Sequence, residues 1–415
     1  MKILHISTSD DGGAGIACIR LHQGLLELGV DSKVLVFLKR RNIPEVYQFY
    51  ENKSSNYILD KYRFFKFGFY EGINRLMLLN RVKGNEIFTF PKSLIPLHNH
   101  PLVKEADIVH LQWVSYFLNY GTFFKNIKNK KNIWTLHDMN PFTGGCHYAL
   151  DCRKFQNDCT DCPQLQGSIW SDYSKFILDK KLKALKDVNN ISVVSPSQWM
   201  MEESKSSRLF GRFTNYFIPN GIDTDKYKIL DKIKVRDKLK LPRDRIIFLF
   251  VADSLDRRLK GFGILVNVLK KHFNNNKNIL LLTIGSQKNK LEIEGVDIIN
   301  LGYLSSEEKL NEAYSAADVF ITPSLAESFG NTVLESMLCG TPVIGFPVGG
   351  VKEQIINGKN GILSIDITED ALAESINEFV NKKYIFESNK IREISEKNYN
   401  LRQYAEKYLE IYKSQ

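Results

Sequence analysis

The chain has 415 residues, of which 43% are hydrophobic and 25% are charged. This length exceeds one ordinary hydrophobic core, so we expect two domains of about 200 residues each, and the composition argues against disorder and fibrous repeats. No stretch reaches about 18 uncharged apolar residues, which argues against a membrane-spanning helix. The N-terminus runs directly into a strand-like Ile3–Ile6 without a signal core, so we expect a cytoplasmic protein.

The net charge of +10 is concentrated in the first half of the chain. Residues 1–200 carry 26 Lys and Arg and 18 Asp and Glu, and the segment 33–92 alone carries 12 basic and 5 acidic residues. Twelve aromatic residues lie between Tyr47 and Phe90. Such a mixture suits an anionic membrane surface or single-stranded nucleic acid, and it also occurs in a solvated helix pair whose rings are core. The charge pattern alone leaves these three interpretations open.

Short apolar runs alternate with helical patterns along the chain, and such runs are typical of strands buried on both faces of a parallel sheet. In the first half the predicted strands are Lys2–Ile6, Lys33–Leu38, Asp107–Gln112, Asn132–Leu136, Ile191–Val194 and Tyr216–Ile218. In the second half they are Arg245–Val251, Asn278–Ile284, Val296–Leu301, Asp318–Thr322, Thr341–Gly345 and Gly361–Leu363. Two such series predict an α/β chain with two doubly wound domains.

The boundary between the two series is expected after Ile218–Asp223, where turn residues lead into a charged stretch. We place the first domain at residues 1–225 and the second at 226–395. Residues 396–415 follow the second series and include an amphipathic helix.

A glycine-rich loop, Asp11–Ala17, follows the first strand and opens a helix. Gly12 and Gly13 allow a ligand to approach the backbone, and the helix start offers N–H groups to an anion. The spacing differs from the dinucleotide motif Gly-x-Gly-x-x-Gly. The second strand also ends in Lys39–Arg41, where a ribose-binding acid would be expected. Both features argue against a nicotinamide enzyme.

A second motif, Pro323–Glu335, lies where a predicted strand ends and a helix begins. Glu327 is expected at the carboxyl end of the strand, where open α/β sheets bind ligands, and the amides of residues 329–331 can hold a phosphate. Glu335, two turns along the helix, can reach a ribose diol. In the loop Asp256–Gly261, Lys260 can neutralise a leaving diphosphate. The alternative is a capped helix with two solvated carboxylates and an ordinary basic turn.

These motifs, together with Gly340–Val343 and Gly349–Glu353, closely resemble the retaining glycosyltransferases of family 4 over nearly the whole chain. The resemblance implies the GT-B fold, in which two Rossmann-like domains face each other and a C-terminal helix crosses back to the first. It implies that the second domain binds a nucleotide-sugar and the first binds the acceptor. The implied reaction retains the anomeric configuration and needs no catalytic metal.

The resemblance also assigns roles to single residues. It implies that His137, Glu327 and Lys260 are catalytic, with His137 beside the transferred sugar. The implied donor site consists of Gly12, Gly13, Lys260, Gly302, Tyr303, Glu327, Ser328, Phe329, Gly330, Asn331 and Glu335. The family commonly places an Arg five residues before its Lys, where this chain has Leu255, and Arg257 or Arg258 is the candidate substitute.

Four cysteines, Cys146, Cys152, Cys159 and Cys162, fall within an insertion at residues 144–165. The two-residue gap between the last pair is typical of a structural zinc site, for which His147 is a substitute ligand. Buried thiols or a redox pair are the alternatives. The insertion resembles one found in a branch of family 4 linked to exopolysaccharide assembly.

Two hypotheses of different classes follow from the sequence. The first is a sugar transferase, peripheral at the inner face of the plasma membrane, that uses a UDP- or GDP-sugar and a lipid-linked saccharide acceptor to build a bacterial surface polysaccharide. In this hypothesis residues 33–92 dock on the anionic membrane and no nucleic acid is bound. The second is a catalytically silent subunit of an assembly complex that binds sugar or nucleotide, which the missing Arg at Leu255 favours.

Overall fold

The computed structural model describes residues 1–415 apart from 51–56, 82–86, 288–291 and 415. The chain forms two compact units. Unit 1 comprises Met1–Gly221 and Leu401–Gln415, and unit 2 comprises Ile222–Asn400. Each unit is built on one parallel sheet covered by helices.

The sheet of unit 1 has seven parallel strands in the order β3-β2-β1-β4-β5-β6-β7. These strands are β1 Lys2–Ser9, β2 Asp31–Leu38, β3 Val46–Gln48, β4 Ile108–Leu111, β5 Lys131–Thr135, β6 Ile191–Ser195 and β7 Thr214–Phe217. The α-helices of this unit are α1 Gly12–Glu27, α2 Tyr57–Met77, α3 Pro101–Glu105, α4 Tyr120–Asn126, α5 Tyr173–Leu185, α6 Gln198–Ser206 and α14 Leu401–Lys413. Short 3₁₀ turns lie at Leu97–Asn99, Asn140–Phe142, Lys154–Gln156 and Pro163–Leu165.

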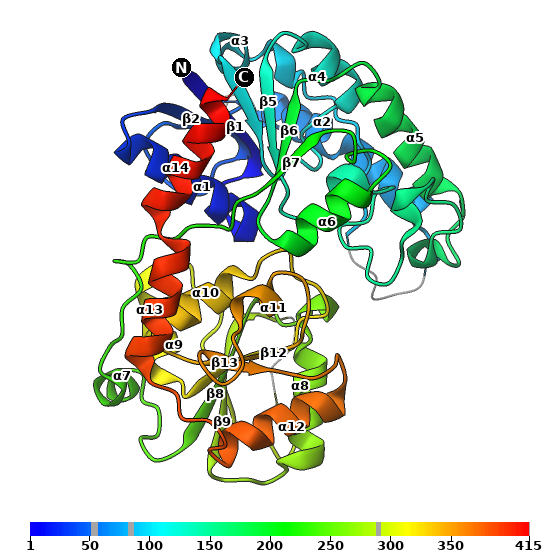
Figure 1. Ribbon diagram of the computed structural model, residues 1–415. Helices are drawn as coiled ribbons and strands as arrows, with labels where there is room; N and C mark the ends of the chain where they lie inside the picture. The colour runs from blue at the N-terminus through cyan, green and yellow to red at the C-terminus, as the bar shows by residue number, and fades with distance from the viewer. Residues whose placement is uncertain (51–56, 82–86, 288–291, 415) are drawn as a thin grey trace. The chain divides into compact units, whose positions relative to one another are not determined.

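The last helix, α14, packs on unit 1 beside α1 (Figure 1). Its apolar stripe, which includes Leu401, Tyr404 and Tyr408, joins a core formed with β1, β4, β5 and α1. The two helices approach closely because α1 has Gly24 at their contact. A Cβ at this position would lie 3.0 Å from the Cβ of Ala405. The C-terminal helix is therefore an integral layer of unit 1.

The sheet of unit 2 has six parallel strands in the order β10-β9-β8-β11-β12-β13. These strands are β8 Ile246–Ser254, β9 Ile279–Ser286, β10 Ile298–Asn300, β11 Val319–Thr322, β12 Val343–Gly345 and β13 Gly361–Leu363. The helices are α7 Lys232–Lys238, α8 Phe262–His272, α9 Glu307–Ala316, α10 Asn331–Leu338, α11 Val351–Gln354, α12 Glu369–Val380 and α13 Ser388–Tyr399, with a 3₁₀ turn at Arg258–Lys260.

The predicted fold class is confirmed, because both halves are parallel, doubly wound sheets. All twelve predicted strands overlap strands of the structure. The sequence reading missed β3, a three-residue edge strand whose last two residues are only partly buried. An edge strand this short carries too few apolar residues to show a period. No helix in the described part of the chain is long and apolar enough to cross a bilayer.

Candidate functional site

The strand order of unit 2 reverses between β8 and β11, and open α/β sheets bind ligands at such a switch point, beyond the carboxyl ends of the strands. Lys260 follows β8, and Glu327 follows β11. The Lys260 ammonium forms an ion pair with the Glu327 carboxylate, whose Oε1 also accepts a hydrogen bond from the Ser324 hydroxyl at 3.3 Å. The structure therefore brings the two predicted catalytic groups of unit 2 together at its switch point.

Gly261 makes this approach possible. It adopts φ +73°, and a Cβ on it would lie 1.8 Å from the Pro323 carbonyl oxygen. Only glycine fits such a position, because both the backbone angle and the space exclude a side chain. The close contact continues where the Leu325 N–H donates to the Leu259 carbonyl at 2.8 Å. The loop after β8 is thus fixed against the turn after β11, with Lys260 between them.

A glycine shapes the turn that leads from Glu327 into α10. Gly330, with φ +94°, precedes the first residue of α10, and Gly350 donates its N–H to the Glu327 carbonyl at 3.2 Å. The ring of Phe329 is buried and lies 5.7 Å from the ring of Tyr399, so only the backbone of Phe329 is available to a ligand. Ser328 lies in the same turn, and Asn331 begins the helix.

Glu335 lies one helical turn into α10, and its side chain is largely buried. Its Oε2 accepts a hydrogen bond from the Tyr314 hydroxyl at 3.2 Å. Burial raises the pKa of Tyr314 well above its ordinary value, and the neighbouring carboxylate adds to the rise. Tyr314 therefore stays protonated and keeps donating to Glu335. Tyr314 was not predicted from the sequence, because a tyrosine on the apolar face of a helix is usually a core residue.

Gly302 and Tyr303 follow β10 at the same edge of the sheet. Gly302 has φ +71°, and its N–H donates to the Asn300 side chain at 2.9 Å. The Tyr303 ring is 57% exposed. Because the strands are parallel, these residues lie at the sheet edge that also carries Lys260 and Glu327, on the far side of β9.

Leu255 is core, so no cation stands where the family commonly has its Arg. Of the two candidate substitutes, Arg257 pairs with the Asp253 carboxylate at 3.1 Å, and Arg258 is exposed on the 3₁₀ turn that carries Lys260.

In unit 1 the strand order reverses between β1 and β4. Gly12 and Gly13 begin α1 at the carboxyl end of β1, and a Cβ on either residue would meet no atom within 4 Å. Behind them, a Cβ on Gly15 would lie 2.7 Å from the backbone of Asp10, so a glycine is required where α1 leaves the strand. The loop thus offers open backbone at the switch point of unit 1.

His137 follows β5 and lines a cavity at the carboxyl end of β4 and β5 with Gln112, Trp113 and Asp138. Its Nε2 lies 2.7 Å from the Gln112 Oε1. Burial lowers the pKa of His137 to about 4, and Asp138 opposes this shift only in part. The ring is therefore neutral near pH 7 and offers one donor and one acceptor.

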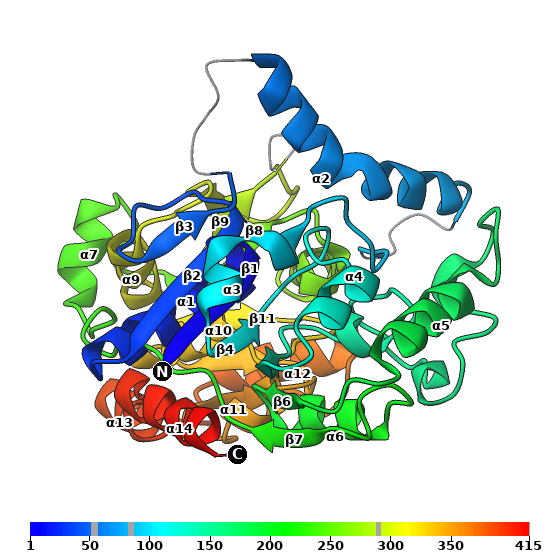
Figure 2. The same cartoon turned by 90° about the horizontal axis from the view of Figure 1, so that it is seen from above.

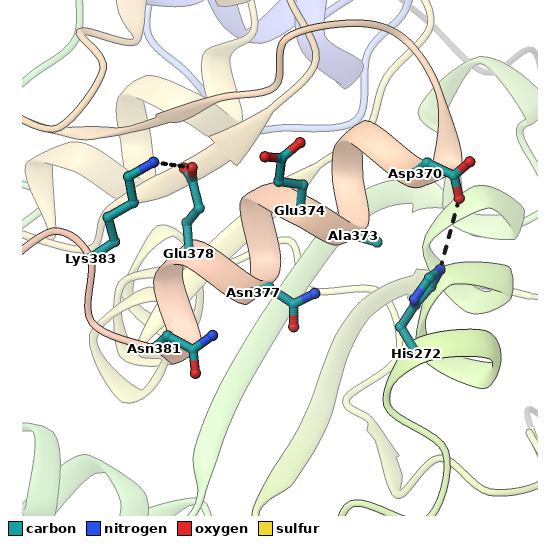
Figure 3. Close-up of a pocket in the computed structure, with 8 residues that line it drawn as sticks. All are labelled: His272, Asp370, Ala373, Glu374, Asn377, Glu378, Asn381 and Lys383. Atoms are coloured by element: carbon teal, nitrogen blue, oxygen red, sulfur yellow. Dashed lines mark hydrogen bonds and ion pairs between the residues drawn. The ribbon is translucent and has the colours of Figure 1, made fainter.

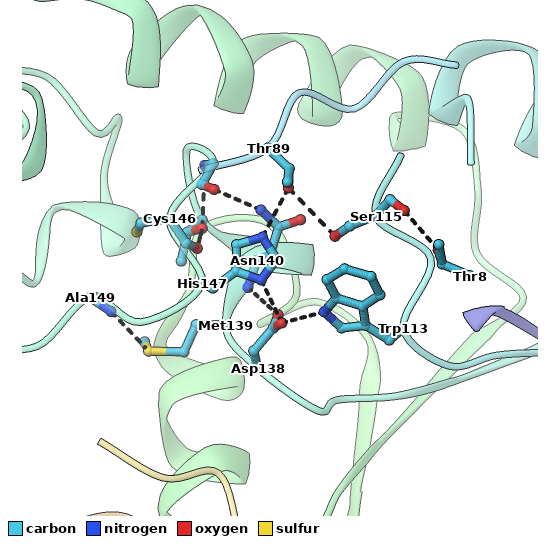
Figure 4. Close-up of polar contacts among 12 residues, drawn as sticks. Thr8, Thr89, Trp113, Ser115, Asp138, Met139, Asn140, Cys146, His147 and Ala149 are labelled. Carbon is cyan, nitrogen blue, oxygen red and sulfur yellow. Dashed lines mark hydrogen bonds and ion pairs between the residues drawn. The ribbon is translucent and has the colours of Figure 1, made fainter. Parts of the chain in front are cut away.

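Asp138 holds the loop that carries His137 (Figure 4). Its Oδ2 lies 2.6 Å from the His147 Nδ1 and accepts from the Trp113 indole at 2.7 Å, and its Oδ1 accepts from the Asn140 N–H at 2.9 Å. Although burial acts against it, the His147 partner and these donors keep the pKa of Asp138 below its ordinary value. The sequence reading named neither Gln112 nor Asp138 as site residues, although a polar residue directly after a buried strand is a usable signal.

The four cysteines of the insertion line one small, apolar cavity with Phe88 and Phe155. All four are free thiols. Burial raises the pKa of Cys159 to about 12 and also raises those of Cys146 and Cys162. These three thiols therefore stay protonated and poorly reactive at neutral pH.

The prediction of a zinc site is not supported. Within the described ranges no group of three or more His, Cys, Asp or Glu residues is arranged to hold a metal ion. The substitute ligand His147 is engaged on both ring nitrogens, by Asp138 and by the Thr89 hydroxyl at 3.1 Å (Figure 4). The insertion is held instead by apolar packing and by hydrogen bonds such as Ser174 to the Cys159 carbonyl at 2.6 Å.

A separate hollow lies along α12 in unit 2, lined by His272, Asp370, Ala373, Glu374, Asn377, Glu378, Asn381 and Lys383 (Figure 3). None of the predicted site residues lines it. It is an acidic helix face flanked by His272 and Lys383.

Residues 231–407 match the family of glycosyl transferases group 1. The chain is 22% identical over 364 residues to the putative colanic acid biosynthesis glycosyl transferase WcaC of Escherichia coli, covering 83% of this chain and 82% of that protein. It is 32% identical to a D-inositol 3-phosphate glycosyltransferase of Acidothermus cellulolyticus, but that match spans only 35% of this chain and 36% of that protein.

Among solved structures, HepE of Anabaena in complex with UDP and glucose superposes with a TM-score of 0.66 at 17% identity, covering 100% of both chains. Sucrose-phosphate synthase of Thermosynechococcus elongatus gives the same TM-score at 18% identity, covering 99% of this chain and 98% of that one. These likenesses show the fold. The chain therefore has the GT-B fold, and residues 231–407 within it match the family of glycosyl transferases group 1.

Proposed function

We propose that the protein transfers a sugar, with retention of configuration, from a nucleoside-diphosphate sugar bound by unit 2 to a saccharide acceptor. The observation that carries the proposal is the Lys260–Glu327 ion pair at the switch point of the unit 2 sheet. It places a cation for a diphosphate and a carboxylate for sugar hydroxyls side by side. The complex of HepE with UDP and glucose supports a uridine nucleotide as the first donor to test.

In this proposal each group has a defined task. Lys260 leaves Glu327 and binds the diphosphate, where it stabilises the charge that develops as the bond from the sugar C1 to the diphosphate oxygen breaks. The acceptor oxygen bonds to C1 on the same face, and its proton passes to the departing diphosphate. Glu327 orients the sugar through its hydroxyls, Glu335 holds the ribose, and the backbone from Ser328 to Asn331 binds sugar and phosphate. Gly302 and Tyr303 hold the base.

Unit 1 supplies the remaining contacts in this proposal. Gly12 and Gly13 approach the donor through open backbone, and His137 contacts the transferred sugar. Product release from labelled UDP-glucose, UDP-galactose and GDP-mannose tests the proposal with wild type, Lys260→Met and Glu327→Gln. We expect the wild type to turn over one of these donors and both variants to lose that activity. Turnover that survives in both variants would contradict the assignment.

A silent binding subunit is the second candidate, and the buried Leu255 favours it because one diphosphate contact of the family is missing. The two candidates differ in one respect only. Both predict nucleotide binding, whereas the transferase alone predicts release of nucleoside diphosphate when donor and acceptor are present.

We further propose that the acceptor is lipid-linked, that it belongs to surface polysaccharide synthesis, and that α2 docks unit 1 on an anionic membrane. The likeness to WcaC supports the polysaccharide role. One face of α2 packs on unit 1, where the rings of Phe67 and Phe37 stack at 4.0 Å. Tyr62 and Phe65 point away from this face and are 51% and 55% exposed, whereas the 58% exposed Phe64 also meets the Phe37 ring edge-on at 6.0 Å.

Exposed rings and cations share this helix, which lies along the periphery of unit 1 in Figure 2. Lys61 is exposed beside Tyr62, and the Lys66 ammonium lies 4.5 Å from the centre of the Tyr62 ring. Amphipathic helices of this composition bind anionic lipid surfaces, and the binding falls with salt. Lys53 and Lys83 of the basic segment lie outside the described residues.

Sedimentation with phosphatidylglycerol vesicles tests the docking helix. Tyr62→Ser/Phe65→Ser is expected to lose most of the bound fraction, and neutral phosphatidylcholine vesicles should bind little of any variant. Ile365→Ser/Ile385→Ser is the control, because it removes two apolar side chains of unit 2 that are even more exposed, at 87% and 85%. Equal binding by both double variants would contradict a role for α2.

A further inference from the structure

One face of the unit 1 sheet carries a line of polar side chains, most of which are buried. Side chains two residues apart along a strand share a face. His110 and Gln112 therefore lie on one face at β4, and Thr135 and His137 on the same face at β5, the face that α14 covers. In a sheet built for apolar packing, polar residues in these positions need a structural or chemical reason.

Hydrogen bonds join these residues from α14 to the carboxyl edge of the sheet. The Tyr412 hydroxyl of α14 lies 2.7 Å from the His110 Nδ1, and the Thr135 hydroxyl lies 2.7 Å from the His110 Nε2. The Tyr408 hydroxyl lies 2.8 Å from that of Thr135. His110 is thus held on both ring nitrogens by groups that α14 supplies directly or through Thr135.

Gln112 forms the next link. Its amide nitrogen lies 3.2 Å from the His110 Nε2 and 3.2 Å from the His5 Nδ1, and its Oε1 lies 2.7 Å from the His137 Nε2. The two amide hydrogens thus face two ring nitrogens, and the carbonyl oxygen faces the third. Because a carbonyl oxygen only accepts, the His137 Nε2 must carry the proton.

We propose that Gln112 is a positioning residue for His137: it holds the ring with its proton on Nε2, so that Nδ1 is the acceptor presented to the cavity, and α14 fixes Gln112 through His110. This inference rests on the proposed function, in which His137 contacts the transferred sugar. It assigns the direction of that contact, with a sugar hydroxyl donating to Nδ1. The described residues supply no hydrogen-bond partner for Nδ1.

The proposal gives α14 a task beyond covering the sheet. Tyr412 is 275 residues after His137 in the chain, yet only His110 and Gln112 separate the two side chains in the network. The opposite orientation of the Gln112 amide would reverse the ring protonation of His137. The position of that proton is therefore a direct report on the network.

Nitrogen NMR of the full-length protein labelled with ¹⁵N-histidine tests this without any need for turnover. His137→Asn assigns the signal. We expect wild type to show a neutral His137 ring with its proton on Nε2, and Gln112→Glu to keep that proton position because a carboxylate still accepts from Nε2. Gln112→Leu and Tyr412→Phe should mix the two ring forms. A proton on Nδ1 in wild type, or an unchanged ring in Gln112→Leu, would overturn the proposal.

Kinetics with the donor give the second readout. Gln112→Leu is expected to lower kcat about 10- to 100-fold with little change in the donor KM, and Gln112→Glu to recover part of kcat. Gln48→Leu is the matched control, since it removes a Gln side chain that bonds a carbonyl near the sheet edge, far along the strand order from His137. A loss in kcat that is equal in Gln48→Leu would contradict positioning. If neither the wild type nor any variant turns over the donor, the proposed function fails. The NMR measurement of the His137 ring protonation still tests whether Gln112 positions His137.

Discussion

Removal of the Lys260–Glu327 ion pair separates what the pair does for stability from what it does for transfer. The Lys260 side chain is 24% exposed and the Glu327 side chain 11%, so Glu327 is the more deeply buried partner. Lys260→Met keeps most of the side-chain length but leaves the Glu327 carboxylate with the Ser324 hydroxyl at 3.3 Å. We expect the free energy of unfolding to fall by about 1–3 kcal/mol, the usual cost of a poorly paired buried acceptor.

Glu327→Gln should cost less, because the Lys260 ammonium is more exposed and can reach solvent. The double variant Lys260→Met/Glu327→Gln has no unpaired charge. It should therefore be more stable than the sum of the single effects predicts, by about 1 kcal/mol. Transfer behaves differently, because all three variants lack the diphosphate cation or the sugar-binding carboxylate. We expect each to lose at least about 100-fold in kcat/KM.

Urea unfolding followed by far-ultraviolet circular dichroism measures the stabilities. Tryptophan fluorescence does not suffice, because all four tryptophans, Trp113, Trp134, Trp170 and Trp199, lie in unit 1. Strictly additive losses of stability would refute the argument that the two side chains form one coupled pair. Near-native turnover in the double variant would refute their place in the chemistry.

Three further predictions follow from the geometry. Gly261→Ala should unfold unit 2 or lower its stability by about 4 kcal/mol or more, because at φ +73° a Cβ would lie 1.8 Å from the Pro323 oxygen. Gly263→Ala on α8 is the control: a Cβ there meets nothing within 4 Å, so the stability should rise by about 0.5–1 kcal/mol. Thermal melts of the two variants compare them directly. Tyr314→Phe removes the hydroxyl that donates a hydrogen bond to Glu335 without a change of shape, so the KM for the nucleotide-sugar should rise several-fold with kcat nearly unchanged. An unchanged KM in steady-state kinetics would argue against Glu335 as the ribose ligand. Burial lowers the pKa of His137 to about 4 and lowers those of His5 and His110 well below their ordinary values. Below about pH 6.5 the unfolded chain therefore binds more protons than the folded one, and the free energy of unfolding should fall as the pH drops towards 4, by up to about 3 kcal/mol for His137. Denaturant titrations at each pH should show a shallower fall in His137→Asn.

The fold was readable from the sequence because its signals are local and repeated. Runs such as Ile246–Val251 and Ile279–Leu282 are apolar throughout, as is typical of strands buried on both faces, and turn residues lie nearby. Gly12 and Gly261 mark loops as the sequence predicts, and each adopts a positive φ. β3 was not predicted, because three residues at a sheet edge are too few to show a hydrophobic periodicity.

The site was only partly readable. Motif spacing led to Lys260 and Glu327, which the structure brings into contact although 67 residues separate them. The sequence did not indicate four further residues, Gln112, Tyr314, Tyr408 and Tyr412. Their hydrogen-bond partners lie on other strands and helices, and a local sequence pattern does not predict a tertiary hydrogen bond. The metal site expected from the cysteine spacing is not supported by the described part of the chain. Spacing shows that thiols can meet, and the structure shows them sharing an apolar cavity while His147 bonds elsewhere.

The most direct test of the central claim is a thermal-shift titration of the purified protein with UDP, GDP, ADP, CMP and NAD, carried out in parallel on Lys260→Met. A ligand that binds only the folded state stabilises it by about 2.7 kcal/mol at 100 times its Kd. The account predicts a clear rise in melting temperature with one nucleoside diphosphate, none with NAD, and a much smaller rise in Lys260→Met. Cooperative melting of wild type that none of these nucleotides shifts would contradict a nucleotide-sugar site in unit 2.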